Sequence, residues 1–313
     1  MELERRALYN SLRMNWQRDK SLDVEPWQVA DYRSWEIEDL FDALAEHHSQ
    51  MDPEQFRIYA EEDDSPESLA GSLGLEEATP EQEDQLYLVV FELWRRLLPE
   101  RQTLSIFCDE LDHQINQYDL DPTSEGEAIQ DTLANLKEVL DENCDEGLDP
   151  EEAFDLFSSF CANDLASFLY DFIANEIEEG DTGYATDLLE EFTPYLGEDP
   201  WFHFLQARLW AEADPEQAAE GIAILLSEKP ELGLRLEILE FLAKEGEREQ
   251  FIQVARESLP LVSAEADLFD LLHYCADYYH RLDQEEKGNA VEALTSQASD
   301  VENTVKSLAG ILQ

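Results

Sequence analysis

Apolar residues recur along much of the chain at the three- and four-residue spacing of an amphipathic helix. The clearest runs are Ile37, Leu40, Phe41 and Leu44; Ile129, Leu133, Leu136 and Leu140; and Phe154, Phe157, Cys161 and Leu165. No segment alternates apolar and polar residues convincingly, and no Asn-Gly hairpin turn occurs. The pattern therefore predicts an all-α protein, built as a helical array.

A tetrapeptide typical of helix starts occurs four times, beginning at Asp52, Thr79, Asp149 and Asp214. In each copy Pro is second, Glu is third and Gln or Glu is fourth. The first side chain can cap a helix, and Pro loses no hydrogen bond in a first turn. The fourth side chain can bond back to the backbone of the cap. We therefore expect a helix to begin at each copy.

Acidic residues are concentrated between positions 61 and 84, where ten acids occur without a base and with little helical periodicity. We interpret this segment as an acidic linker. It would separate an N-terminal helical segment at residues 1–60 from an acidic helical domain at residues 85–180. The remainder, residues 181–313, has a pattern of its own.

Prolines at positions 200, 230 and 260 divide this C-terminal part into units of 30 residues. The first unit places Phe202, Leu205 and Leu209 on one helix and Ala218, Ile222 and Leu225 on the next. The arrangement resembles a tetratricopeptide repeat, whose period is about 34 residues. Departures are Gln206, which replaces a small residue, and a second unit that matches only at Leu236, Leu239, Leu242, Ala255 and Pro260. The resemblance implies an α-solenoid over residues 181–313.

The charge balance restricts the partners that this chain could bind. It has 75 acidic residues against 20 Lys and Arg, a formal net charge of −55. Such a chain repels nucleic acid phosphates and anionic lipid and attracts basic protein surfaces. We therefore expect no direct nucleic acid binding and no membrane association.

The charge is also uneven along the chain. Residues 138–207 hold 20 acids and no Lys or Arg, whereas the first 20 residues carry a net charge of +2. The basic N-terminus could dock on an acidic body of its own chain or of a neighbour. Leu8, Leu12 and Trp16 form a helical stripe in this segment. We expect it to pack into the core or to form a homo-oligomer contact.

The cysteines and the N-terminal residues bear on the cellular compartment. Cys108, Cys144, Cys161 and Cys275 are widely spaced and form no C-x-x-C motif, which favours free, inert thiols. The first residues have no apolar core of a secretory signal. The longest apolar run, Leu86 to Phe91, is too short to span a membrane. These features together predict a cytoplasmic protein.

Residues 141–152, DENCDEGLDPEE, resemble the calcium loop of an EF-hand. Asp141, Asn143, Asp145, Asp149 and Glu152 occupy the ligand positions. However, Glu146 stands where the family has Gly, and no second loop occurs. The segment is therefore interpreted as an acidic turn between helices. Glu110 and His113 form the one Glu-x-x-His pair, although di-iron bundles need two.

The sequence favours a non-enzymatic interaction module, such as a chaperone or an adaptor, that binds a basic protein or peptide. No cofactor and no metal ion are expected. The candidate partner-binding residues are Asp141, Asp145, Glu146, Asp149, Glu151, Glu152, Glu176, Glu178 and Glu179. One alternative is a DNA mimic that occupies a DNA-binding protein, and another is calcium binding through residues 141–152. A third is an acidic composition that reflects a saline cytoplasm.

Overall fold

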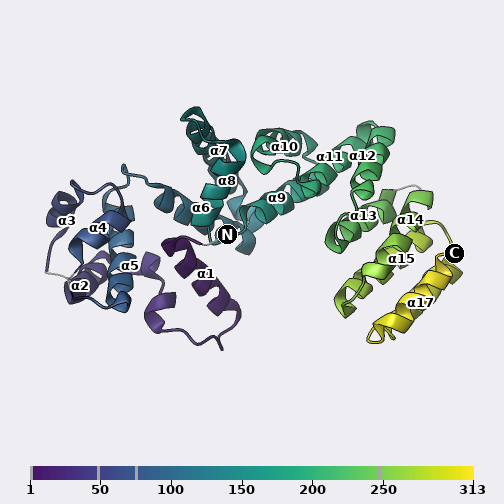
Figure 1. The fold of residues 1–313 in the computed structure, drawn as a ribbon, viewed down its shortest axis with the longest axis horizontal. Helices are drawn as coiled ribbons and strands as arrows, with labels where there is room; N and C mark the ends of the chain where they lie inside the picture. The colour runs from purple at the N-terminus through teal and green to yellow at the C-terminus, as the bar shows by residue number, and fades with distance from the viewer. Residues whose placement is uncertain (1–2, 48–49, 75–76, 246–247) are drawn as a thin grey trace. The chain divides into compact units, whose positions relative to one another are not determined.

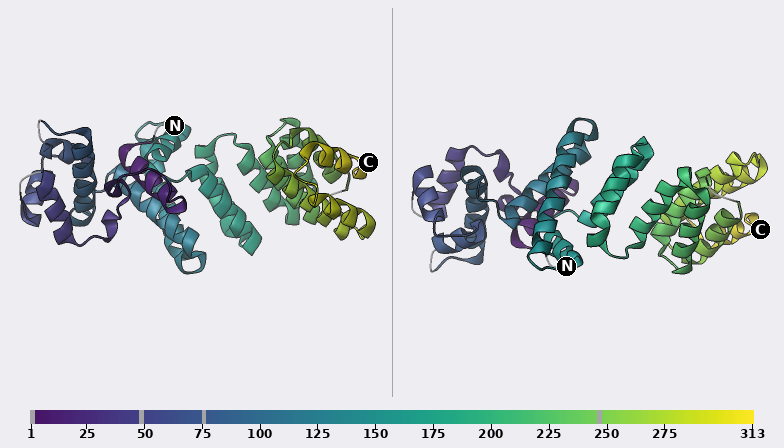
Figure 2. Two further views of the ribbon diagram at one scale, coloured as in Figure 1. Left: turned by 90° about the horizontal axis from the view of Figure 1, so that it is seen from below. Right: turned by 90° about the horizontal axis from the view of Figure 1, so that it is seen from above.

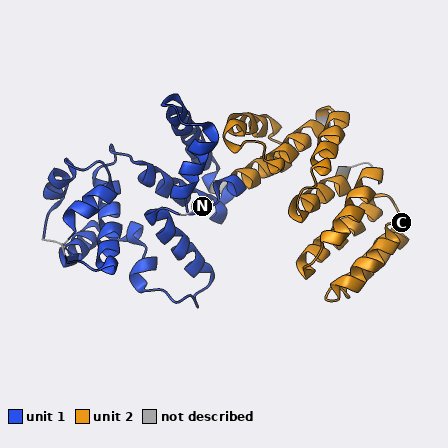
Figure 3. Ribbon diagram, viewed as in Figure 1, with its two compact units in different colours: residues 1–168 blue, residues 169–313 orange. Residues whose placement is uncertain are grey.

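The computed structural model describes residues 3–47, 50–74, 77–245 and 248–313, and every regular element within these ranges is a helix (Figure 1). The predicted all-α class is therefore confirmed. The chain divides into two compact units, residues 1–168 and 169–313 (Figure 3). Within each unit the helices pack side by side, as the two turned views also show (Figure 2).

Unit 1 holds eight α-helices in its described part, together with two short 3₁₀ helices. They are α1 (Arg5–Arg18), η1 (Pro26–Val29), η2 (Tyr32–Ser34), α2 (Ile37–His47), α3 (Pro53–Ala60), α4 (Pro66–Leu73), α5 (Pro80–Leu97), α6 (Leu104–Leu120), α7 (Pro122–Asp145) and α8 (Pro150–Phe160). Helix α5 is central to the core, because Tyr87, Phe91 and Trp94 are fully buried in it. Helices α2 and α4 cover α5.

The segment at residues 61–84 does not have the structure expected of an acidic linker. Ser65 caps α4 by accepting a hydrogen bond from the Ser68 N–H, and Leu69 of α4 is fully buried. The carboxylate of Asp63 accepts hydrogen bonds from the hydroxyls of Ser68 and Ser72 at 2.5 and 3.0 Å. Glu67 is the one acid within α4, and the other acids of the segment come before and after this short helix in the sequence, so the acidic composition did not indicate its apolar face.

The division between the units lies instead at the first turn of α9 (Leu165–Glu179). The C-terminal part that was expected to begin at residue 181 therefore begins one helix earlier. Unit 2 continues with α10 (Thr182–Leu196), α11 (Pro200–Ala213), α12 (Pro215–Ser227), α13 (Leu232–Glu245), α14 (Arg248–Ser258), η3 (Leu259–Leu261), α15 (Glu265–Arg281), α16 (Glu285–Thr295) and α17 (Val301–Ile311).

Consecutive helices of unit 2 pack in pairs, α11 with α12, α13 with α14 and α15 with α16, and α13 also packs against α11 and α15. Pro200 begins α11, Pro230 lies shortly before α13, and Pro260 lies in η3, which precedes α15. One apolar core runs through these helices and includes Phe204, Leu239 and Tyr278. The tetratricopeptide-like interpretation of this part stays a prediction, as does its solenoid character.

All four predicted helix starts are confirmed. Asp52 and Thr79 form complete capping boxes, with Gln55 and Gln82 returning a bond to the backbone of each cap. Asp149 caps α8 and Asp214 caps α12, each through its carboxylate. These caps satisfy backbone N–H groups that would otherwise have no partner.

The basic N-terminus docks on its own unit. Arg6 Nε lies 2.6 Å from Asp109 Oδ1 of α6, and Arg5 of α1 pairs with Asp84 of α5. Leu8 is 53% exposed, so the stripe at Leu8, Leu12 and Trp16 is not the face that α1 buries. The buried residues of α1 are Arg6, Ala7 and Tyr9.

Candidate functional site

The nine acidic residues proposed from the sequence lie in two places. Asp141, Asp145, Glu146, Asp149, Glu151 and Glu152 surround the turn between α7 and α8 in unit 1, and Glu176, Glu178 and Glu179 end α9 in unit 2. Two of the first six have local partners. Lys137 Nζ lies 2.5 Å from Asp141 Oδ2, and Asp149 Oδ1 accepts the Glu151 N–H at 3.1 Å.

The turn at residues 141–152 does not have the geometry of a calcium loop. Helix α7 continues through Asp145, so the first three ligand positions are helical. The Leu148 N–H donates to the Asn143 carbonyl at 3.2 Å, and the Gly147 N–H donates to the Cys144 carbonyl at 2.9 Å. Gly147 has a φ of 110°. These features are those of a helix C-cap closed by glycine, so the segment is an interhelical turn.

The other metal-binding pattern in the sequence, Glu110 with His113, already has a basic partner. Glu110 Oε2 lies 2.8 Å from Arg33 Nη1, and burial together with Arg33 lowers the pKa of the nearby His113. Within the described residues, no group of three or more His, Cys, Asp or Glu side chains is arranged to hold a metal ion.

Two of the cysteines, Cys161 and Cys275, are poor nucleophiles in this structure. Cys108, Cys161 and Cys275 are buried, and Cys144 is partly exposed. Burial raises the pKa of the Cys275 thiol to about 12, and a hydrogen bond with Cys108 raises that of Cys161. Thiols that are held protonated in this way react slowly.

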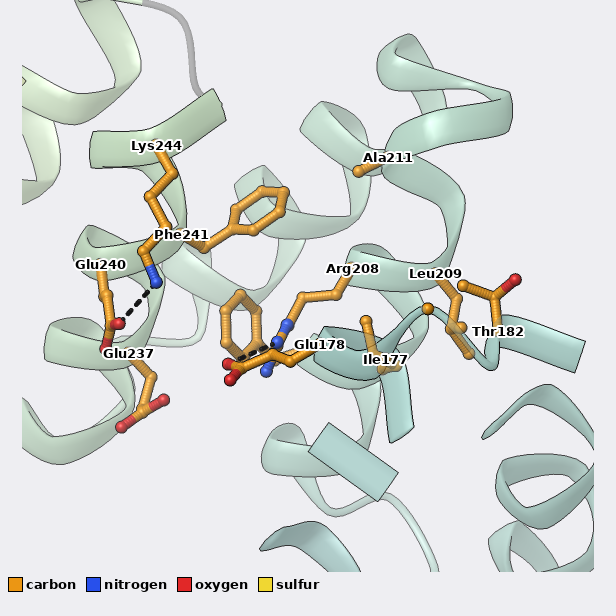
Figure 4. A pocket seen from close by; sticks show the side chains of 12 residues that line it. Ile177, Glu178, Thr182, Arg208, Leu209, Ala211, Glu237, Glu240, Phe241 and Lys244 are labelled. Carbon is orange, nitrogen blue, oxygen red and sulfur yellow. Dashed lines mark hydrogen bonds and ion pairs between the residues drawn. The ribbon is translucent and has the colours of Figure 1, made fainter. Parts of the chain in front are cut away.

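A cavity of about 300 Å³ lies in unit 2 and is lined mainly by α9, α11 and α13 (Figure 4). We call it the α9/α11/α13 groove. Its apolar wall includes Ile177, Phe204, Leu209 and Phe241. Its charged groups are Glu178, Arg208, Glu237, Glu240 and Lys244. Figure 4 shows Arg208 reaching from α11 towards Glu178, with Glu237 and Glu240 on α13.

Two carboxylates of the groove have basic partners. Arg208 Nη2 lies 3.2 Å from Glu178 Oε1, and Lys244 Nζ lies 2.7 Å from Glu240 Oε1. The Tyr274 hydroxyl also donates to Glu240 Oε2 at 3.2 Å. The hydrogen bond from Lys244 lowers the pKa of Glu240, so this carboxylate is ionised and satisfied.

The third carboxylate, Glu237, differs from the other two. It is partly buried and forms no hydrogen bond or ion pair with the described residues. Burial raises its pKa, and the neighbouring carboxylate of Glu240 raises it further. Cation binding is favoured at a half-buried carboxylate without a partner, because the ion pair offsets the carboxylate's loss of hydration.

Unit 1 has a second cavity, of about 390 Å³, lined by residues of α1 and α6 together with Asp31 and Arg33. Three of its basic groups already pair with its acids. Arg6 and Arg33 lie 2.6 and 2.7 Å from the Asp109 carboxylate, and Arg13 lies 3.0 Å from Asp31. We therefore place the candidate site in unit 2.

Comparison with protein-family models, with curated proteins and with solved structures finds no match to this chain. None of the helices in the described ranges is long and apolar enough to cross a membrane.

Sequence reasoning found one residue of the groove, Glu178, and missed Arg208, Glu237 and Glu240. The missed residues lie outside the basic-free segment and come from two helices that only tertiary packing brings to Glu178. One signal was present. Arg208 is the first basic residue after 70 positions without one, and its side chain is only 12% exposed.

Proposed function

We propose that this protein is a non-enzymatic interaction module whose α9/α11/α13 groove binds a basic segment of a partner protein. The observation that carries the proposal is Glu237, a half-buried carboxylate without a partner in an otherwise paired and partly apolar groove. A Lys or Arg side chain supplies both the missing charge and an aliphatic stem that can lie on the partly exposed Phe241.

The overall charge supports the same kind of partner. A net charge of −55 accelerates the approach of a basic protein and disfavours nucleic acids and anionic lipids. Long-range attraction of this kind is screened by salt over about 10 Å at 0.1 M. Contacts made inside the groove are screened less, so they would determine which basic segments remain bound.

The test uses an oligoarginine peptide and an oligocitrulline peptide of equal length, which has the same shape without the charge. Calorimetry measures the affinity of the full chain for each peptide at low and at moderate salt. The triple variant E178Q/E237Q/E240Q removes the three carboxylates of the groove. We expect its affinity for oligoarginine to fall on the order of tenfold, the scale measured for close charge pairs at interfaces.

The matched control is E216Q/E220Q/E228Q, which removes the same charge from exposed positions on and just after α12. It should weaken binding much less, and the difference between the two variants should persist at moderate salt. Equal losses in the two variants would mean that only net charge attracts the peptide, and the groove would be rejected as its site.

A further inference from the structure

Arg208 is held in the groove by an unusually small number of contacts. Its guanidinium makes one hydrogen bond within the described residues, to Glu178 at 3.2 Å, and the Glu178 side chain is 60% exposed. By contrast, the Arg96 guanidinium of unit 1 donates to Glu92 and to three backbone carbonyls. A guanidinium has five N–H donors, so most of those of Arg208 lack a protein acceptor.

A buried hydroxyl beside Arg208 is also unsatisfied. Tyr170 of α9 is 8% exposed, and its ring packs edge-on against Trp201 at 5.1 Å and against Phe202 at 6.2 Å. Its hydroxyl is buried and, among the residues that the structure describes, has no hydrogen-bond partner of good geometry. Burial raises the pKa of Tyr170, as does the nearby charge of Glu237, while Arg208 lowers it. Buried hydroxyls without a partner are uncommon and costly.

The three groups therefore form an incomplete set. The charges of Arg208 and Glu237 both act on the Tyr170 hydroxyl, and Arg208 also lowers its pKa through a hydrogen-bonding contact. That contact does not have the geometry of a full hydrogen bond, and among the described residues Arg208 and Glu237 form no ion pair with each other. The chain thus places a cation of its own where a basic guest would bind, in a position that gives Tyr170 no hydrogen bond of good geometry and Glu237 no ion pair within the described residues. An internal cation that is held this weakly can be replaced by a better-placed one.

We propose that Arg208 is an internal occupant of the α9/α11/α13 groove, and that a partner's arginine displaces it to bind Glu237 and the Tyr170 oxygen. This inference rests on the proposed function, because it describes how the same groove is kept closed to weak ligands. Arginine fits better than lysine, since its planar fork can bond a carboxylate through two N–H groups and can stack on Phe241.

The sharpest test is R208K, which leaves the net charge unchanged. Lysine lacks the fork, so it holds Glu178 less well and leaves more of the groove free. We expect R208K to bind oligoarginine several-fold more tightly than the unchanged protein, and R208Q to bind more tightly still. R208Q also removes a positive charge, so its control is K306Q. Lys306 is an exposed residue of α17 that forms an ion pair with Glu302 of the same helix.

Tyr170→Phe tests the second contact. It should weaken oligoarginine binding several-fold while leaving oligolysine binding nearly unchanged, and its thermal unfolding should show that the unit is intact. Tyr170→Phe introduced into R208K should likewise weaken oligoarginine binding several-fold and leave oligolysine binding nearly unchanged.

The outcomes separate the two proposals. R208K is compared with the unchanged protein, and R208Q is compared with K306Q. If neither variant binds oligoarginine more tightly than its reference, Arg208 does not occupy the site and the inference fails. Weaker binding in R208K would make Arg208 a part of the binding surface, which also overturns it. The proposed function survives both results provided that E178Q/E237Q/E240Q still loses affinity, and it fails if that variant does not.

Discussion

Arg6 of α1 and Asp109 of α6 are joined by a hydrogen bond of 2.6 Å between Nε and Oδ1, and both side chains are buried. Arg33 and Asn10 bind the same carboxylate, at 2.7 and 2.9 Å. The pair ties the N-terminal helix to the middle of unit 1 across 103 positions of sequence. It also explains why a segment with positive net charge can begin a chain that is otherwise so acidic.

Removing one partner of this pair should be costly. Arg6→Met leaves the Asp109 charge buried with fewer partners, and we expect the free energy of unfolding of unit 1 to fall by about 3–5 kcal/mol. Arg5→Met is the control, because the Arg5–Asp84 pair is about one-third exposed and such pairs contribute roughly 0–1 kcal/mol. Urea unfolding followed by tryptophan fluorescence measures both. Similar losses in the two variants would contradict the buried role of Arg6.

The same carboxylate gives unit 1 a defined acid sensitivity. Burial tends to raise the pKa of Asp109, but Arg6 and Arg33 outweigh it and lower the pKa to about 2. The pKa of Asp109 in the folded protein is below its unfolded value of about 3.9. The ionised carboxylate therefore contributes its full stabilisation of unit 1 above pH about 3.9, and this stabilisation is lost as the pH falls to about 2. We expect about 2 kcal/mol of the stability of unit 1 to disappear over this range. In Asp109→Asn the loss over this range should be correspondingly smaller.

Binding of oligoarginine should depend on pH through Glu237. Burial and Glu240 raise its pKa, while Arg208 of α11 lowers it and Asp171 and Glu178 of α9 raise it. A guest cation lowers the pKa of Glu237, so binding releases protons in mild acid. The affinity for the guest therefore rises with pH until Glu237 of the free protein is already fully ionised. Calorimetry in buffers of different ionisation enthalpy measures the released protons. An equal release in E237Q would assign it to another group.

The turn at residues 141–152 should be sensitive to its glycine and insensitive to calcium. Gly147→Ala places a side chain at a φ of 110°, which should cost unit 1 about 1 kcal/mol. Gly126→Ala is the control, because Gly126 lies within α7 and an added Cβ would meet no neighbouring atom. That variant should gain about 0.5–1 kcal/mol. A rise in the melting temperature with calcium but not with magnesium would contradict our interpretation of the turn.

Helix α4 should contribute to the stability of unit 1. Leu69→Ala removes a fully buried side chain, and we expect a loss of about 2–5 kcal/mol. Leu120→Ala, at a position that is 80% exposed, should change the stability by less than about 0.5 kcal/mol. Thermal unfolding compares the two variants. No loss in Leu69→Ala would restore the interpretation of residues 61–84 as a linker.

The features that could be predicted from the sequence are those encoded locally. The caps at Asp52, Thr79, Asp149 and Asp214 each act within one helical turn, so four residues were enough to predict a helix start. Helix α4 was missed because it has only two turns, and its apolar residues become informative only where they pack against α5.

The groove could not be predicted, for a related reason. Glu178, Arg208 and Glu237 are separated by roughly 30 residues each, and every helix nearby also carries acids. Nothing in such a composition distinguishes a carboxylate that faces a cavity from one that faces water. That distinction depends on burial and on which bases are already paired, and both are properties of the folded chain.

The burial of basic residues in unit 1 has a consequence for the solution around the protein. Arg6 and Arg33 share the carboxylate of Asp109, and Arg95 and Arg96 share that of Glu92, so these four bases are already engaged within their own unit. The outer carboxylates must therefore be balanced by mobile cations held near the surface. When a basic polypeptide displaces those ions, their dilution into bulk provides an entropic driving force that weakens as the electrolyte becomes more concentrated.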